Sequence, residues 1–211
     1  MITGLLAVGA LLFLPAGSFS YWQAWLLIAI LFIPMITAGC IMKVKAPDLL
    51  HKRLNAREDQ QEQKTVVALS AVMFVASFIV AGLNYRFQWL VLPARSSWAT
   101  AAVFLVGYAL YAEVMRENAY LSRTVEVQED QRVVDTGLYG AVRHPMYLAT
   151  LIMFLNMPLV LGSPISLLLM LIYIPIIVKR IKNEEILLER ELEGYAEYKQ
   201  RVRYRLVPYI W

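Results

Sequence analysis

The sequence predicts an all-α, polytopic integral membrane protein, and two observations carry that prediction. The 211 residues are 59% hydrophobic and only 17% charged, whereas soluble domains are about half apolar and about a quarter charged. The apolar residues also form long uncharged runs at positions 1–42, 65–85, 96–112 and 145–178. One helical crossing needs about 20 apolar residues, so these runs indicate a bundle of membrane helices.

The runs divide into about six membrane helices. The first run holds two, because the turn signal at residues 15–18 separates a first helix from a second at about 21–42. Single helices are expected at about 65–83 and 97–115. The last run would be about 51 Å long as one straight helix, which exceeds a hydrocarbon core of about 30 Å. Turn residues around Pro158 and Gly162 therefore predict a hairpin of two short helices that reverses near Leu161.

A C-terminal amphipathic helix is expected after these membrane helices. From Glu184 onward, apolar residues recur at three- and four-residue spacing with charges between them: Leu188, Leu192, Tyr195, Tyr198 and Val202. Such a helix lies on the cytoplasmic surface or roofs a cavity. Tyr195 and Tyr198 are interpreted as packing and interface anchors, with ligand contact as the less favoured alternative.

The distribution of charge predicts the topology. Of the 20 Lys and Arg residues, 18 fall in segments 43–64, 116–143 and 179–211, and only Arg86 and Arg95 lie between other helices. The positive-inside rule places those three segments, and both chain ends, in the cytoplasm. The basic residues that orient the protein in the membrane then account for the net charge of +4. A nucleic-acid partner is therefore not expected.

Composition excludes several kinds of site. Cys40 is the single cysteine, which excludes an internal disulfide, and one Cys with two His is too few for a Cys/His zinc site. No metal is expected. The sequence has no GxGxxG and no GxxxxGK[ST] motif, so a nucleotide-like cofactor must be held in another way.

The informative motif lies at the predicted cytoplasmic start of the fifth helix. Pro145 suits the first turn of a helix, so the helix begins beside His144. Arg143 and His144 then lie at the positive helix end, which favours a carboxylate or phosphate. The competing interpretation makes Arg143 a snorkelling flank and His144 a simple cap.

A second motif follows the hairpin. Arg180 and Glu184 are four residues apart, and the simplest interpretation is a surface ion pair. The hairpin, however, returns them to the side where His144 lies. A cation, a carboxylate and a helix N-terminus would then converge on one cavity that suits a zwitterion, with Glu184 on its ammonium group.

Together these motifs resemble a known family. The set comprises Tyr139, Arg143-His144-Pro145-x-Tyr147, Arg180-x-x-x-Glu184-Glu185, Glu197-Tyr198 and a Pro-aromatic ending. It resembles the isoprenylcysteine carboxyl methyltransferase family and its phospholipid methyltransferase relatives, from about Thr124 to Trp211. The resemblance implies a membrane methyltransferase that uses S-adenosylmethionine without a Rossmann domain. Its acceptor would be a lipophilic or lipidated molecule, such as an isoprenylcysteine-type carboxylate; lipid amines, phenols and hydrophobic thiols stay open.

The resemblance also implies roles for particular residues. Residues 1–115 would form an N-terminal four-helix membrane region, and residues 116–211 would bind the cofactor and carry catalysis. Arg180 would orient the acceptor. Two positions depart from the family: Ala149 replaces a glycine, which can narrow the cavity, and Gln131 stands where a histidine is found. The implied cofactor contacts are Gln131, Arg132, Val133, Val134, Tyr139, His144, Pro145, Met146, Tyr147 and Glu184.

Two other functions stay open at this point. The ending at residues 204–209, with the Arg-His-Pro-x-Tyr motif, also resembles NADPH-dependent membrane sterol reductases, and Arg201, Arg203 and Arg205 would bind the phosphates. A noncatalytic membrane interaction protein would explain the helices but not the convergent motifs. The spacing of Arg180 and Glu184 favours the methyltransferase.

Overall fold

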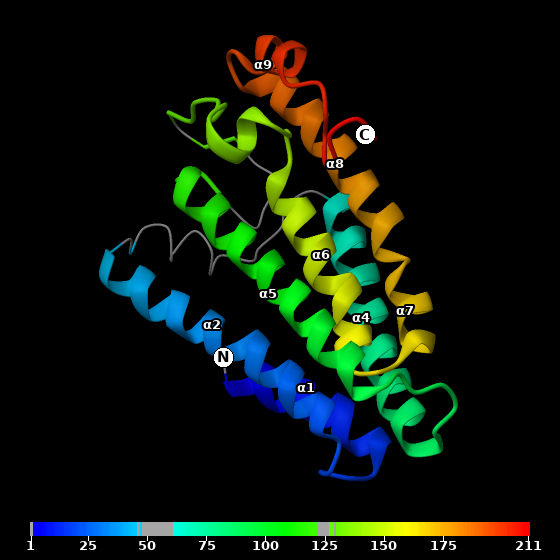
Figure 1. The fold of residues 1–211 in the computed structure, drawn as a ribbon. Helices are drawn as coiled ribbons and strands as arrows, with labels where there is room; N and C mark the ends of the chain where they lie inside the picture. The colour runs from blue at the N-terminus through cyan, green and yellow to red at the C-terminus, as the bar shows by residue number, and fades with distance from the viewer. Residues whose placement is uncertain (1, 46, 48–60, 122–126, 129) are drawn as a thin grey trace.

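The computed structural model describes residues 2–45, 47, 61–121, 127–128 and 130–211, and these form helices and connecting segments without strands (Figure 1). The predicted all-α class is confirmed. The elements are α1 (Ile2–Ala16), α2 (Trp22–Lys45), α4 (Gln61–Phe87), α5 (Ala94–Glu117), the 3₁₀ helix η1 (Gly137–Gly140), α6 (Pro145–Val160), α7 (Pro164–Met170), α8 (Tyr173–Glu191) and α9 (Tyr195–Arg201).

Within the residues that the structure describes, four stretches of helix are long and apolar enough to cross a membrane. They are α2, most of α4, α5, and the 28 residues Pro164–Glu191 that combine α7 and α8. The other two apolar helices, α1 and α6, are shorter, with 15 and 16 residues. These helices fit a membrane protein, and the count of six crossings stays a prediction.

The predicted hairpin is confirmed in its position. α6 ends at Val160 and α7 begins at Pro164, so the chain reverses at Leu161. The second arm consists of α7 followed by α8 and continues through the charged residues up to Glu191. Lys, Arg, Glu and Leu are strong helix formers, so the helix continues beyond the last apolar residue.

Two apolar clusters hold the helices together. The larger one joins α1, α2, α4, α5 and α6 through buried residues such as Leu12, Phe78 and Phe104. The second joins α4, α6, α7 and α8. α5 packs closely along α6 at Gly107, where a Cβ atom would lie 2.8 Å from Met153 Cγ. Small residues allow membrane helices to approach in this way.

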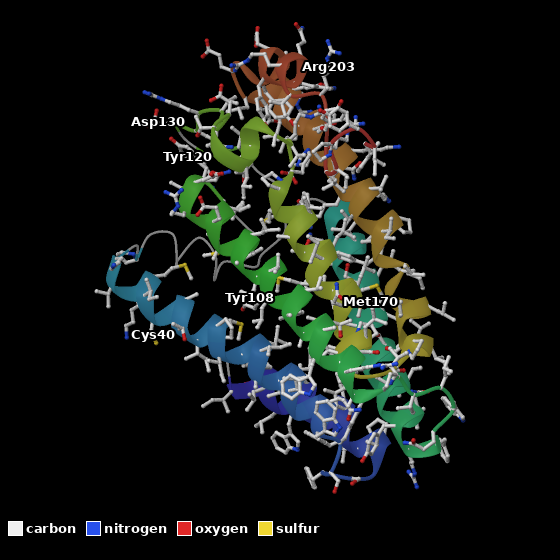
Figure 2. The ribbon with its side chains drawn as sticks, in the orientation of Figure 1. Cys40, Tyr108, Tyr120, Asp130, Met170 and Arg203 are labelled. Atoms are coloured by element: carbon white, nitrogen blue, oxygen red, sulfur yellow. The ribbon has the colours of Figure 1, made fainter. Side chains whose placement is uncertain are left out.

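The two ends of the bundle differ. The α1–α2, α4–α5 and α6–α7 connections meet at one end, which we call the loop end, where the Tyr21 hydroxyl donates to the Leu161 carbonyl at 2.7 Å. α9, η1 and the start of α6 lie at the opposite end, the cavity end (Figure 1). Figure 2 shows oxygen and nitrogen atoms gathered there, around Tyr120, Asp130 and Arg203. Arg86 and Arg95 lie next to the α4–α5 connection, as the charge pattern predicts.

The prediction of a single amphipathic helix after Glu184 is wrong, because the chain forms two helices there. α8 ends at Glu191, and Gly194 has a positive φ of 81° before α9 begins. Glycine adopts this left-handed conformation without steric cost, so the helix ends here despite the continuing apolar spacing. The apolar residues still share one cluster, because the turn folds α9 back beside residues 127 and 133.

Candidate active site

The turn before α6 holds Arg143 and His144 inside the protein. Pro145 is the first residue of α6 and His144 is its N-cap residue, as predicted. The backbone N–H groups of Arg143 and His144 donate to the carbonyl oxygens of Tyr204 and Arg205, both at 2.9 Å. This pairing fixes the C-terminal segment beside the turn and covers both side chains, which are 5% exposed.

A buried carboxylate, Glu185, lies at the centre of a charge network. Its Oε1 atom accepts a hydrogen bond from Arg143 Nε at 2.8 Å and lies 3.2 Å from His144 Nε2. Its Oε2 atom accepts from Arg205 Nε at 2.8 Å. Buried charges are tolerated when they are paired and hydrogen-bonded. This network therefore ties α8, the turn before α6 and the C-terminal segment into one unit.

Arg143 differs from both interpretations of the sequence. Its Nη1 atom donates to the carbonyl oxygens of Val202 and Arg203 at 2.7 and 2.8 Å, while its other nitrogens meet Glu185. The snorkelling interpretation is wrong, because the side chain is buried. Its charge is already balanced by Glu185, so Arg143 is not the cation that we expected for an anionic ligand.

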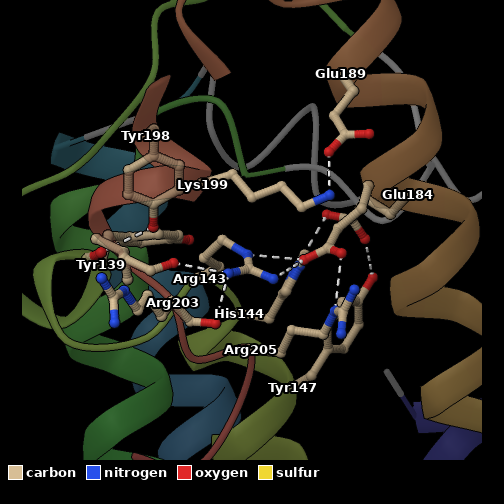
Figure 3. Close-up of polar contacts among 12 residues, drawn as sticks. Tyr139, Arg143, His144, Tyr147, Glu184, Glu189, Tyr198, Lys199, Arg203 and Arg205 are labelled. Carbon is tan, nitrogen blue, oxygen red and sulfur yellow. Dashed lines mark hydrogen bonds and ion pairs between the residues drawn. The ribbon is translucent and has the colours of Figure 1, made fainter. Parts of the chain in front are cut away.

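Tyr147 connects the two sequence motifs. Its hydroxyl donates to Glu184 Oε2 (Figure 3). The same oxygen accepts from Arg180 Nε at 2.9 Å. Arg180 and Glu184 therefore meet at a buried tyrosine from α6, rather than as the surface pair considered from their spacing alone.

His144 faces both glutamates of α8. Its Nε2 atom points to Glu185, and its Nδ1 atom lies 4.0 Å from Glu184 Oε1. A hydrogen on Nε2, donated to Glu185, orients the ring so that Nδ1 faces Glu184. The prediction that an imidazole and a carboxylate distant in the chain meet at one end of the bundle is confirmed.

The segment before the Arg143-His144-Pro145 motif forms another wall of the site. The Tyr139 hydroxyl accepts from Asn118 Nδ2 at 2.9 Å, and its carbonyl accepts from the Tyr198 hydroxyl at 2.8 Å. Gln131 closes a local turn, since its Oε1 accepts from the backbone N–H of Gln128 at 2.9 Å. These bonds hold η1 and residues 131–134 beside α9.

A cavity opens between these elements, and its lining contains nearly all the residues that the sequence suggested. Pro145 is the exception, because it is buried in the first turn of α6. Ala149 is fully buried and also lies outside the lining, so this departure from the family does not narrow the cavity. The predicted residues in the lining are Gln131, Arg132, Val133, Val134, Tyr139, His144, Met146, Tyr147, Arg180 and Glu184.

Some members of the site were not predicted from the sequence, among them Glu185, Asn118 and Tyr120. Glu185 had a usable signal: it continues the four-residue spacing of Tyr173, Ile177 and Ile181, which form the buried face of α8. For Asn118 and Tyr120 we find no such signal, because only the folded chain brings residues 118–121 to the cavity. The further lining residues are Asn118, Tyr120, Leu121, Arg143, Leu187, Leu188, Leu192, Tyr195 and Tyr198.

Fold and site together define a class: a helical membrane protein with a polar cavity at one end of an apolar bundle. Residues 98–190 match the model of the isoprenylcysteine carboxyl methyltransferase family. The chain is also 24% identical over 153 residues to a protein-S-isoprenylcysteine O-methyltransferase of Dictyostelium discoideum, covering 68% of this chain and 65% of that protein. These findings confirm the family resemblance predicted from the motifs.

A relative from another class of enzyme matches a shorter part. The chain is 31% identical over 91 residues to a Delta(14)-sterol reductase of Mus musculus, covering 42% of this chain and 22% of that protein. The chain thus spans less than two thirds of the length of either curated relative.

Proposed function

We propose that this chain is an integral membrane methyltransferase that transfers a methyl group from S-adenosylmethionine to a lipophilic acceptor. One observation carries the proposal: His144, Tyr147 and Glu184 converge, with Arg180, on a single cavity at the end of an apolar bundle. The match of residues 98–190 to the carboxyl methyltransferase family supports the same reaction.

The chemistry of the cavity fits this cofactor. The Glu184 carboxylate and the Tyr147 hydroxyl suit an ammonium group, while Val133, Leu188 and Leu192 give apolar walls for a nucleoside. S-adenosylmethionine carries no phosphate, so a glycine-rich phosphate loop is not needed. When bound, it supplies an electrophilic methyl group on a positively charged sulfur.

The residues of the chain position the acceptor and exclude water. Arg180 orients the acceptor carboxylate, and its bond to the Tyr147 hydroxyl fixes the guanidinium beside the cavity. Methyl transfer from a sulfonium to a carboxylate would neutralise opposite charges. A site shielded from water favours this step. A carboxylate is already anionic and needs no general base.

The proposal also assigns separate roles to the two parts of the chain. Residues 116–211 carry the site, and residues 1–115 form a membrane region that presents it at the cytoplasmic face. Apolar helices on either side let an isoprenylcysteine-type acceptor keep its tail in lipid while its carboxylate reaches Arg180. Membrane lipids are then the natural surroundings of both substrate and enzyme.

Calorimetry on protein purified in detergent tests the proposal. We expect S-adenosylhomocysteine, the demethylated product, to bind the wild type. Glu184→Gln should weaken that binding at least about tenfold, because a charged hydrogen bond contributes about 1.5–3 kcal/mol. The thermal unfolding midpoint should stay near that of the wild type, because the Glu184 side chain is partly exposed.

Arg180→Ala is the matched variant from the same helix. It should retain affinity for S-adenosylhomocysteine and lower methyl transfer from radiolabelled S-adenosylmethionine to membrane extract. Equal loss of cofactor affinity in both variants would contradict the separate roles. Failure of the wild type to bind S-adenosylhomocysteine would overturn the methyltransferase assignment.

The match to the mouse sterol reductase favours a second candidate, an NADPH-dependent membrane reductase. Of the three arginines suggested for the phosphates, none lines the cavity, and Arg203 is exposed. Arg201 pairs with Asp135 at 2.7 Å, and Arg205 is engaged by Glu185. Both of these cations already have acidic partners, so they are poorly placed for dinucleotide phosphates. Binding of NADPH with indifference to S-adenosylhomocysteine would decide for the reductase.

A further inference from the structure

Tyr195, the first residue of α9, carries a buried hydroxyl that no described residue of the chain bonds. The residue is 4% exposed and lines the cavity. Its oxygen has no hydrogen-bond partner among the described residues. Buried tyrosine hydroxyls normally find a partner, so an unpaired one in a cavity wall indicates a position for a ligand atom.

The ring of Tyr195 is fixed, so its hydroxyl cannot turn away to solvent. It packs in the cluster with Leu192, Tyr198 and Val202, and its ring centroid lies 5.7 Å from that of Tyr198. α9 itself is held in place by the bond from the Tyr198 hydroxyl to the Tyr139 carbonyl and by the ion pair of Lys199 with Glu189 (Figure 3).

The neighbouring tyrosine gives a direct contrast. Tyr198 is equally buried, at 2% exposed, and also lines the cavity, but its hydroxyl is used within the protein. Burial, with the nearby Glu185 and Glu184 carboxylates, raises the pKa of Tyr195. The hydroxyl thus stays protonated at neutral pH and can donate a hydrogen bond.

We propose that Tyr195 is a cofactor-binding residue whose hydroxyl donates to the nucleoside portion of the bound ligand. The proposal rests on the proposed function and adds a contact that the sequence motifs do not contain. The apolar neighbours of the Tyr195 ring, Leu188, Leu192 and Val133, favour the nucleoside over the amino-acid end. The charged end of the ligand is met by Glu184 and Tyr147.

Tyr195→Phe tests the contact, because it removes only the oxygen. We expect this variant to bind S-adenosylhomocysteine about threefold to tenfold more weakly than the wild type, the loss expected for one hydrogen bond. Methylthioadenosine, which lacks the amino-acid end, should lose affinity by the same factor. The ligand-free unfolding midpoint should not fall, because the hydroxyl has no protein partner to lose.

Two further variants serve as controls. Tyr198→Phe should lower the ligand-free unfolding midpoint, because it removes the bond to Tyr139. Tyr209→Phe, on a side chain that is 89% exposed, should change neither property.

Unchanged ligand affinity in Tyr195→Phe would overturn the proposal. Weaker binding of S-adenosylhomocysteine with unchanged binding of methylthioadenosine would overturn it too, because the contact would then not be to the nucleoside. A wild type that binds S-adenosylhomocysteine while Tyr195→Phe binds it equally well overturns this inference alone. A wild type that does not bind it overturns the proposed function and, with it, this inference.

Discussion

The loop end and the cavity end bury different kinds of polar partners. At the loop end the partners are neutral: the Asn84 side chain is 1% exposed and bonds both the N–H and the carbonyl of Leu90. At the cavity end, Arg143 and Glu185 are buried as charges. Neutral pairs cost little to place in an apolar bundle, whereas a buried ion pair depends on every partner being present. Stability should therefore be far more sensitive to substitution at the cavity end.

The largest expected effect is that of Glu185→Gln. Removing this charge leaves Arg143 and His144 buried without their acidic partner, and we expect a loss of about 3–5 kcal/mol in the free energy of unfolding. Denaturant titration in detergent micelles measures it. The control is Glu189→Gln, because Glu189 pairs with Lys199 through side chains that are 39% and 35% exposed. Such a surface pair contributes about 0–1 kcal/mol. Similar losses in the two variants would contradict the expected difference between a buried and an exposed carboxylate at the cavity end.

A smaller effect is expected for Gly137→Ala, also at the cavity end. Gly137 has a positive φ of 55°, and an added Cβ would lie 1.7 Å from Glu117 Oε1, whose carboxylate accepts the Leu138 N–H. The backbone strain alone costs about 1–3 kcal/mol. Thermal unfolding should show this loss, whereas Gly39→Ala should not, since nothing lies within 4 Å of that added Cβ. An unchanged unfolding midpoint in Gly137→Ala would contradict this prediction, because it would mean that the turn has room to adjust.

The smallest effect is expected inside the apolar bundle, for Ser77→Ala. The Ser77 hydroxyl lies 2.7 Å from that of Ser166, which donates to the Ser77 carbonyl at 2.6 Å. Hydrogen bonds between membrane helices contribute about 0.6 kcal/mol on average. Ser70→Ala is the control, because Ser70 bonds only the Val66 carbonyl of its own helix. A loss in Ser77→Ala as large as that in Glu185→Gln would remove the distinction between the bundle and the cavity end.

Local patterns in the sequence predicted much of the fold. Uncharged runs gave the positions of α2, α4 and α5, and turn residues placed the reversal at Leu161. They did not predict that α8 ends at Glu191 and that Gly194 separates it from α9. Charged residues allow a helix to continue, and the apolar spacing passes unchanged through the glycine. The pattern alone therefore could not locate these helix ends.

The candidate site shows the same division. The sequence by itself determined which residues are chemically capable, and the hairpin implied that His144 and Glu184 would meet. Tertiary structure alone decided how each charge is used: Arg143 is balanced by Glu185, Arg180 and Glu184 meet at Tyr147, and Tyr195 faces the cavity with its hydroxyl unpaired. The physical reason is that helix periodicity assigns a residue to a face. The partner on that face comes from a segment tens of residues away, and only packing brings the two together.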